Sequence, residues 1–425
     1  MRIFRMEFIS LLIFLLSYLL FVLLPKKRTI IAVLGAGLLV LTQAVSLKEA
    51  LSSINWNVMG IFVGTLIVAD VFMKSRVPAY LAELIVNKAK NTAWAILLIC
   101  ALTGFISAFV ENVASVLIVA PIALTLAKKL QLNPIKMMIA LAISSNLQGA
   151  ATLIGDPPSM LLGGFAQMTF GDFFFYKGRP GIFFAVELGA LLSFVVLYFI
   201  FRQHRDKEII ERVERFRSWI PTYLLIAMIF ALAISSFFDP GFTYTAGVIC
   251  MVFGIICALY ETIGNKGSLI QGLKSLDWDT TFFLMGIFVL VGGLTFTGWI
   301  EKISAALSGL VGQSVFWGYT LLVFLAVLFS AFIDNVPFLA TMLPVALSMS
   351  TKLGINPPLF LFGLLIGVSL GGNITPIGAS ANIVACGLLK REGYVVRFRD
   401  FLKIGFPFTL AAVLAAYLFI WYVWK

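Results

Sequence analysis

The sequence has few of the residues on which most enzymes and metal sites depend. Its 425 residues include a single histidine, His204, which lies in a charged segment. The four cysteines lie within apolar stretches and show no Cys-x-x-Cys spacing, so we expect buried thiols: Cys100, Cys250, Cys257 and Cys386. There is no His-Glu-x-x-His motif. An intramembrane enzyme is therefore disfavoured, and we expect no cofactor, with bound Na⁺ as the one alternative.

Charged residues are also scarce. They make up 12% of the chain, against 61% hydrophobic residues, and the mean hydropathy is +1.03. A soluble protein of this size could not bury so much apolar surface, whereas a lipid bilayer removes the need to do so. The net charge of +11 does not indicate nucleic acid as a partner, because the basic residues lie in short segments between apolar runs and form no patch.

Ten apolar runs are long enough to span a membrane: 8–24, 29–45, 56–73, 135–170, 180–201, 219–238, 241–263, 279–297, 357–388 and 402–424. We interpret the first as a retained helix, because no signal-peptide cleavage site follows it. Two further apolar stretches, 93–127 and 314–350, are each interrupted by an acidic residue and an asparagine. Their halves are short for a full crossing, which predicts two re-entrant hairpins.

The distribution of basic residues predicts the orientation. With the N-terminus outside, 23 of the 31 lysines and arginines fall in cytoplasmic loops. The positive-inside rule therefore favours an inner-membrane protein with both termini outside. The polar segment 202–218 becomes a cytoplasmic linker between an N-terminal half, 1–201, and a C-terminal half, 219–425.

The two halves are related by an internal repeat. Residues 107–160 align without a gap on 330–383, and 19 of the 54 pairs are identical, many of them Asn, Pro, Gly or Thr. Each half has five predicted spans and one hairpin, so the second half would cross the membrane upside down. Inverted repeats with interrupted helices are typical of alternating-access transporters, with the site near the midplane. A duplication with a purely structural role is the alternative.

The first candidate site pairs two equivalent hairpin tips. Glu111-Asn112 matches Asp334-Asn335 within these apolar hairpins. A carboxylate at such a place is costly unless it is protonated, paired or bound to a cation, which predicts a proton or Na⁺ site. The alternative is that each acid caps the N-terminus of the returning helix.

The second candidate site is formed by the breaks in the runs 135–170 and 357–388. Glycine and proline there release backbone groups that can bind ions or solutes, although a plain kink is the alternative. We expect both breaks to line one central site, with Thr152 facing Thr375 and each hairpin tip beside its break. The candidate ligands are Asn146, Gly149, Thr152, Gly155, Asp156, Ser159, Gly372, Asn373, Thr375, Gly378, Ser380 and Asn382.

Four motifs carry a family resemblance: FVEN with a later proline (109–121), GAATLIGDPPS (149–159), FIDNVPFLATMLPVA (332–346) and GGNITPIGASANIVACGLLKREG (371–393). They cover both repeats and resemble the ion transporter superfamily, within it the branch of arsenite permeases, NhaD-type sodium/proton antiporters and the melanosomal P protein. The resemblance implies an all-α fold with a scaffold and a transport domain, elevator-like movement and a homodimer.

Two positions depart from the related patterns. Dicarboxylate transporters carry Ser-Asn-Thr at each tip, whereas this chain has an acid, Asn and then Val113 or Val336. Close relatives have Asn at the position of Ser159, as Asn382 still is in the second repeat. The sequence therefore predicts a secondary transporter for a small inorganic ion or an oxyacid such as arsenite, coupled to or exchanging H⁺ or Na⁺. Coupled transport of sulfate, citrate or a dicarboxylate is the alternative, and a channel is disfavoured.

Overall fold

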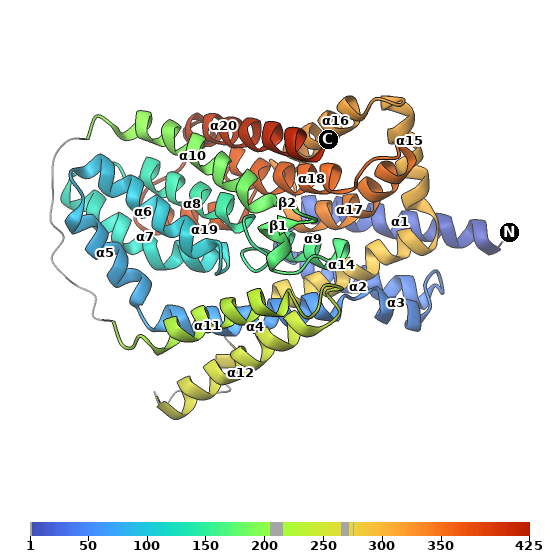
Figure 1. Cartoon of the computed structure of the whole chain (residues 1–425), viewed down its shortest axis with the longest axis horizontal. Helices are drawn as coiled ribbons and strands as arrows, with labels where there is room; N and C mark the ends of the chain where they lie inside the picture. The colour runs from blue at the N-terminus through green and yellow to red at the C-terminus, as the bar shows by residue number, and fades with distance from the viewer. Residues whose placement is uncertain (1, 205–215, 265–271, 275) are drawn as a thin grey trace.

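The computed structural model describes residues 2–204, 216–264, 272–274 and 276–425. Almost all regular structure in this part of the chain is helical, as predicted. The exception is a two-stranded hairpin of β1 (Phe175–Tyr176) and β2 (Arg179–Pro180), in which Phe175 pairs with Pro180. Most long helices run along the longest axis of the molecule, with the N-terminus and α15 toward one end and α5 toward the other (Figure 1).

The N-terminal half consists of α1 (Arg2–Leu23), η1 (Pro25–Lys27), α2 (Arg28–Leu41), α3 (Leu47–Ser53), α4 (Trp56–Lys74), α5 (Val77–Lys88), α6 (Thr92–Ser107), α7 (Asn112–Lys129), α8 (Ile135–Gly149), α9 (Pro157–Ala166), η2 (Gly171–Phe173) and α10 (Ile182–Phe201). Helix starts follow local capping chemistry. Ser46 and Glu49 form a capping box at α3, and the Asn55 side chain accepts a hydrogen bond from the Val58 amide at the start of α4.

The C-terminal half consists of α11 (Ile220–Ser235), α12 (Thr245–Gly264), α14 (Trp278–Phe296), α15 (Trp299–Val311), α16 (Val315–Ser330), α17 (Asn335–Lys352), α18 (Pro358–Gly371), η3 (Gly372–Ile374), α19 (Ser380–Arg391) and α20 (Phe398–Trp424). Asp277 caps α14 as Asn55 caps α4. Figure 1 places α6 and α7 toward one end of the molecule and α16 and α17 toward the other.

Seven described helices are long and apolar enough to cross a membrane, and an eighth span results if α15 and α16, bent by 118°, count as one. Every predicted run contains helix, but α2, α8, α11 and α18 have only 14 to 16 residues. Conversely α7, expected to be a short hairpin arm, has 18 residues and meets the length criterion. The protein is therefore a multi-pass membrane protein, with several spans shorter than their apolar runs.

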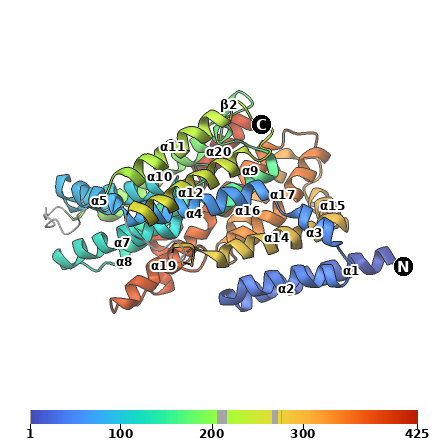
Figure 2. The ribbon, with the colours of Figure 1, turned by 90° about the horizontal axis from the view of Figure 1, so that it is seen from below.

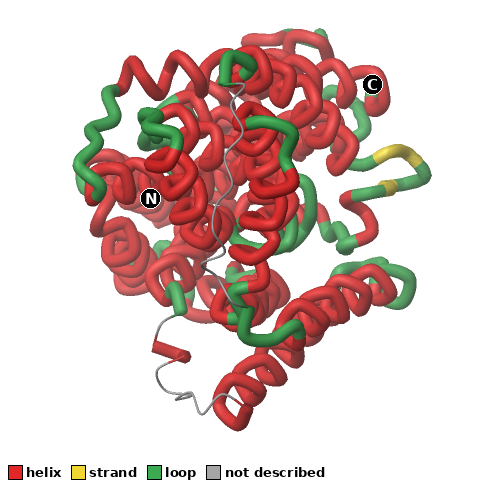
Figure 3. The backbone as a smooth tube through the Cα atoms, turned by 90° about the vertical axis from the view of Figure 1, so that its left-hand side faces the viewer, coloured by secondary structure: helices red, strands yellow, loops and turns green. Residues whose placement is uncertain are grey.

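Helix pairs with one member from each half pack against each other. Helix α4 packs against α12, α2 against α14, and α10 against α20; Figure 2 shows the first of these pairs side by side. Glycine allows the close approach of α4 and α12, since a methyl group added at Gly60 would lie 3.0 Å from the Gly247 Cα atom. Figure 3 shows the helix bundle from one end, with the connections passing between neighbouring helices.

Contacts between loops place the loops in two groups. Three contacts join segments predicted to be cytoplasmic: the Ala93 amide with the His204 carbonyl, the Arg217 amide with the Ser75 carbonyl, and Lys128 with Glu392. Two contacts lie on the predicted outer side: Glu7 with Lys302, and Arg179 with the carbonyl of Val423 at the end of the last predicted run. The predicted grouping of loops thus agrees with the fold. Most of the predicted linker, residues 205–215, lies outside the described residues.

Candidate functional site

The first hairpin tip is the connection between α6 and α7. The Glu111 carboxylate accepts a hydrogen bond from the Ala114 amide at 3.1 Å, and Asn112 Oδ1 accepts one from the Ser107 hydroxyl at 2.6 Å. Both tip side chains are half-buried. Glu111 therefore caps α7, as the alternative interpretation predicted.

The second hairpin tip, between α16 and α17, repeats this arrangement. Asp334 accepts a hydrogen bond from the Val336 amide at 3.1 Å, and the Ser330 hydroxyl donates to Asn335 Oδ1. The tips differ in one respect. Asp334 forms an ion pair with Arg28 at the start of α2, whereas no ion pair to Glu111 is found among the described residues.

The first break joins α8 to α9 and is bonded to the first tip. The Thr152 hydroxyl donates to the Ala108 carbonyl at the tip. A methyl group added at Gly149 would collide with the Asn112 side chain, and one at Gly155 would lie 3.0 Å from the Ala108 carbonyl oxygen. The glycines are thus required because the tip packs directly on the break.

The start of α9 completes this break. The Asp156 side chain accepts a hydrogen bond from the Ser159 amide at 2.9 Å and so caps the helix, while the Ser159 hydroxyl donates to the Gly149 carbonyl at 3.3 Å. All three residues are buried or nearly so. The freed carbonyl of Gly149 is thereby satisfied within the break.

The second break has the same contacts 223 residues later. The Thr375 hydroxyl donates to the Ala331 carbonyl, and a methyl group at Gly378 would lie 2.9 Å from that carbonyl oxygen. Asn382 takes the place of Ser159: its amide donates to the carbonyls of Gly372 at 3.0 Å and Thr375 at 2.9 Å. Both tips therefore lie beside their breaks, as expected.

Three buried asparagines join the two breaks. The Asn146 amide donates to Oδ1 of Asn373 and to Oδ1 of Asn382, both at 2.9 Å. The Asn373 amide in turn donates to the Ile143 carbonyl at 3.3 Å. The breaks thus meet through asparagine side chains, whereas each of the two threonines expected to face each other bonds to its own tip.

One predicted site residue lies apart from the tips and breaks, and three residues that contact the tips were not predicted. Ser380, the first residue of α19, is exposed. Ser107 and Ser330, which orient the tip asparagines, belong to the aligned repeat and could have been chosen from it. Arg28 lies in a basic stretch, which in the sequence indicates only the orientation of the protein in the membrane. Nothing in the sequence predicted its ion pair with Asp334.

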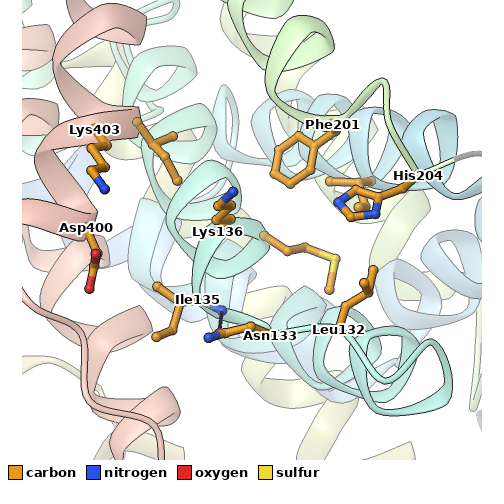
Figure 4. Close-up of a pocket in the computed structure, with 11 residues that line it drawn as sticks. Leu132, Asn133, Ile135, Lys136, Phe201, His204, Asp400 and Lys403 are labelled. Atoms are coloured by element: carbon orange, nitrogen blue, oxygen red, sulfur yellow. Dashed lines mark hydrogen bonds between the residues drawn. The ribbon is translucent and has the colours of Figure 1, made fainter.

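The described residues also line a cavity of about 340 Å³ at one end of the molecule. It lies between the start of α8, the end of α10 and the start of α20, and Figure 4 shows Lys136 between Lys403 and His204. None of its lining residues belongs to a tip or a break. This cavity is therefore separate from the candidate site.

The side chains at the hairpin tips limit which metal ions could bind there. No group of three or more His, Cys, Asp or Glu side chains suited to a metal ion occurs in the described part of the chain. A Na⁺ ion at Glu111 and Asn112, or at Asp334 and Asn335, would thus be bound by one carboxylate with amide and backbone oxygens. Such oxygen donors suit a hard cation.

Comparisons with known proteins agree with this architecture. The chain matches the family CitMHS, citrate transporter, over residues 18–357 and 321–425. An uncharacterized transporter of Mycobacterium tuberculosis is 27% identical, with 98% of each chain covered. The P protein of Homo sapiens is 25% identical, over 91% of this chain and 56% of the human protein.

Solved transporter structures share the fold. The YdaH transporter of Alcanivorax borkumensis has a TM-score of 0.64 at 15% identity, covering 98% of this chain and 97% of YdaH. MtrF of Neisseria gonorrhoeae, an antimetabolite efflux pump, has a TM-score of 0.56 at 14% identity, covering 86% and 80%. With the family match extending over most of the sequence, the chain belongs to the CitMHS citrate transporter family and is a secondary transporter rather than an enzyme.

Proposed function

We propose that this transporter moves a small inorganic ion or oxyacid, coupled to or in exchange for H⁺ or Na⁺, with Glu111 and Asp334 as the coupling carboxylates. One observation carries the proposal: an acid occupies the same point of both repeats, half-buried, on a tip that is bonded to a break. A purely structural cap needs no ionisable side chain, because serine, threonine or asparagine caps a helix as well.

Alternating access through inverted repeats forms part of this proposal. Its support is the odd number of predicted spans per half, the hairpins α6–α7 and α16–α17 toward opposite ends (Figure 1), and the equivalent contacts of Thr152 and Thr375. Discontinuous helices that meet near the middle of the membrane are suited to binding ions there. Elevator-like movement and a homodimer are proposed from the family resemblance.

The identity of the substrate has two candidates. An arsenite-like oxyacid or a monovalent cation suits tips that carry an acid and a valine instead of hydroxyls, and the resemblance to the P protein agrees with this branch. The second candidate is an organic anion such as citrate, after which the matched family is named. A cation brought in with the anion would then occupy the tip carboxylates.

Proteoliposomes distinguish these candidates. We expect purified protein to accumulate labelled arsenite or citrate when a proton or sodium gradient is imposed, and ionophores that collapse the gradient to abolish the accumulation. Protein-free liposomes are the control. Flux that runs only down the substrate's own gradient, at a rate that the ionophores do not change, would show uncoupled transport and contradict the proposal.

A further inference from the structure

The two tip carboxylates have different surroundings. Arg28 Nη1 donates to Asp334 Oδ2, and Nη2 donates to the Thr280 hydroxyl at 3.2 Å. The guanidinium also lies 4.9 Å from the centre of the Phe283 ring and 3.9 Å from Asp279 Oδ2. Three residues of helix α14 thus contact the Arg28 side chain. The Arg28 and Asp334 side chains are 23% and 29% exposed. This is a positioned cation rather than a loose surface lysine or arginine.

No equivalent cation lies at the first tip in the part of the chain that the structure describes. Helix α12 packs on α4 as α2 packs on α14, yet α12 begins at Thr245 and is preceded by Asp239-Pro240-Gly241-Phe242-Thr243-Tyr244, where α2 is preceded by Lys26-Lys27. Among the described residues, Glu111 accepts a hydrogen bond from the Ala114 backbone amide and forms no salt bridge with a basic side chain. Its surroundings therefore favour a bound cation or proton, which neutralises the carboxylate.

We propose that Arg28 is a built-in counter-ion for Asp334, so that only Glu111 takes up the coupling cation and each protomer binds one cation at its tips rather than two. This inference rests on the proposed function and narrows it: Glu111 binds the coupling cation, and Asp334 acts through its ion pair with Arg28. Arg28 acts through Asp334 and is a positioning residue. Because Arg28 belongs to α2 and Asp334 to the tip of a hairpin, the ion pair also tethers that hairpin to the helix pair α2–α14.

The cation count of the purified full-length protein tests this directly. Binding of radioactive sodium ions gives the number of Na⁺ sites per protomer, and infrared difference spectra over a pH titration give the number of tip carboxyl groups that take up a proton. Both counts need no knowledge of the transported substrate. We expect one cation per protomer, as Na⁺ or as a proton, in the wild type, and none in Glu111→Gln.

Variants at Arg28 provide the sharper result. Arg28→Gln frees Asp334, and the count should rise from one to two. The double variant Arg28→Gln/Asp334→Asn should return it to one, and Arg28→Lys, which keeps the charge, should behave as the wild type. A folded Arg28→Gln protein with an unchanged count would overturn the inference.

If Arg28→Gln does not fold, the single variants Glu111→Gln and Asp334→Asn test the inference. The inference requires the count to fall in Glu111→Gln and to stay the same in Asp334→Asn. A fall in both variants means that both acids bind cations, which contradicts the counter-ion role while keeping the proposed function. No change in either variant means that the tips bind no coupling cation, and then the proposed function fails as well.

Discussion

At the residue scale, positions 159 and 382 satisfy equivalent carbonyls with different side chains. Ser159 makes one hydrogen bond, 3.3 Å long, to the Gly149 carbonyl. Asn382 donates to the carbonyls of Gly372 and Thr375 and accepts from Asn146. The Asn382 side chain therefore makes three hydrogen bonds where the Ser159 hydroxyl makes one.

Substituting Asn382 tests this difference. Asn382→Ser removes the links to Thr375 and Asn146 and leaves buried groups unpaired, so we expect the free energy of unfolding to fall by about 1–3 kcal/mol. Thermal unfolding in detergent measures the change. The matched control is Ser380→Ala on the same helix, an exposed position where we expect little effect. A destabilisation by Asn382→Ser no larger than that of the control would show that the asparagine cluster does not hold the breaks together.

At the element scale, the sequence predicted the positions of helices better than their lengths. Apolar runs mark most of the long helices because lipid-facing and buried positions are both apolar in a membrane, whereas α3, α5 and α15 lie outside the predicted runs. The same property hides where helix gives way to other backbone inside a run: the run 29–45 contains α2, which ends at Leu41, and the run 219–238 contains α11, which ends at Ser235. Chain-distant contacts were predictable only where the repeat pointed to them, as for tips and breaks. The ion pair of Arg28 with Asp334 depends on how the helices pack, and it was not predictable from the sequence.

The contact of α4 with α12 gives a prediction at this scale. A methyl group at Gly64 would meet the backbone of Cys250, which cannot move aside cheaply, so Gly64→Ala should destabilise the protein by about 1–3 kcal/mol. Gly37 in α2 has open space around its Cα atom, and Gly37→Ala should be neutral or slightly stabilising because alanine favours helix. Equal melting temperatures for the two variants would contradict the close packing of α4 on α12.

At the scale of the whole molecule, the loops fall into two groups that lie at different ends, and their assignment to the two sides of the membrane stays a prediction. We expect a membrane-impermeant maleimide added to intact cells to label Lys48→Cys and Lys302→Cys but not Lys390→Cys, all exposed positions. Cys386→Ser, which removes the half-buried native thiol, is the background for all three. The opposite labelling pattern would invert the topology and place both termini in the cytoplasm.

Coupling by the tip carboxylates is tested most directly by substrate accumulation in proteoliposomes under an imposed proton or sodium gradient, compared for the wild type, Glu111→Gln and Asp334→Asn. We expect gradient-driven accumulation to disappear in Glu111→Gln and to fall in Asp334→Asn. Glu111→Gln should unfold no more easily than the wild type, because it removes a partly buried charge that has no salt-bridge partner among the described residues. Asp334→Asn leaves Arg28 with only its longer ion pair to Asp279 and should unfold more easily. Both variants accumulating substrate at the wild-type rate, with unchanged dependence on pH and sodium, would show that the two acids serve only as helix caps.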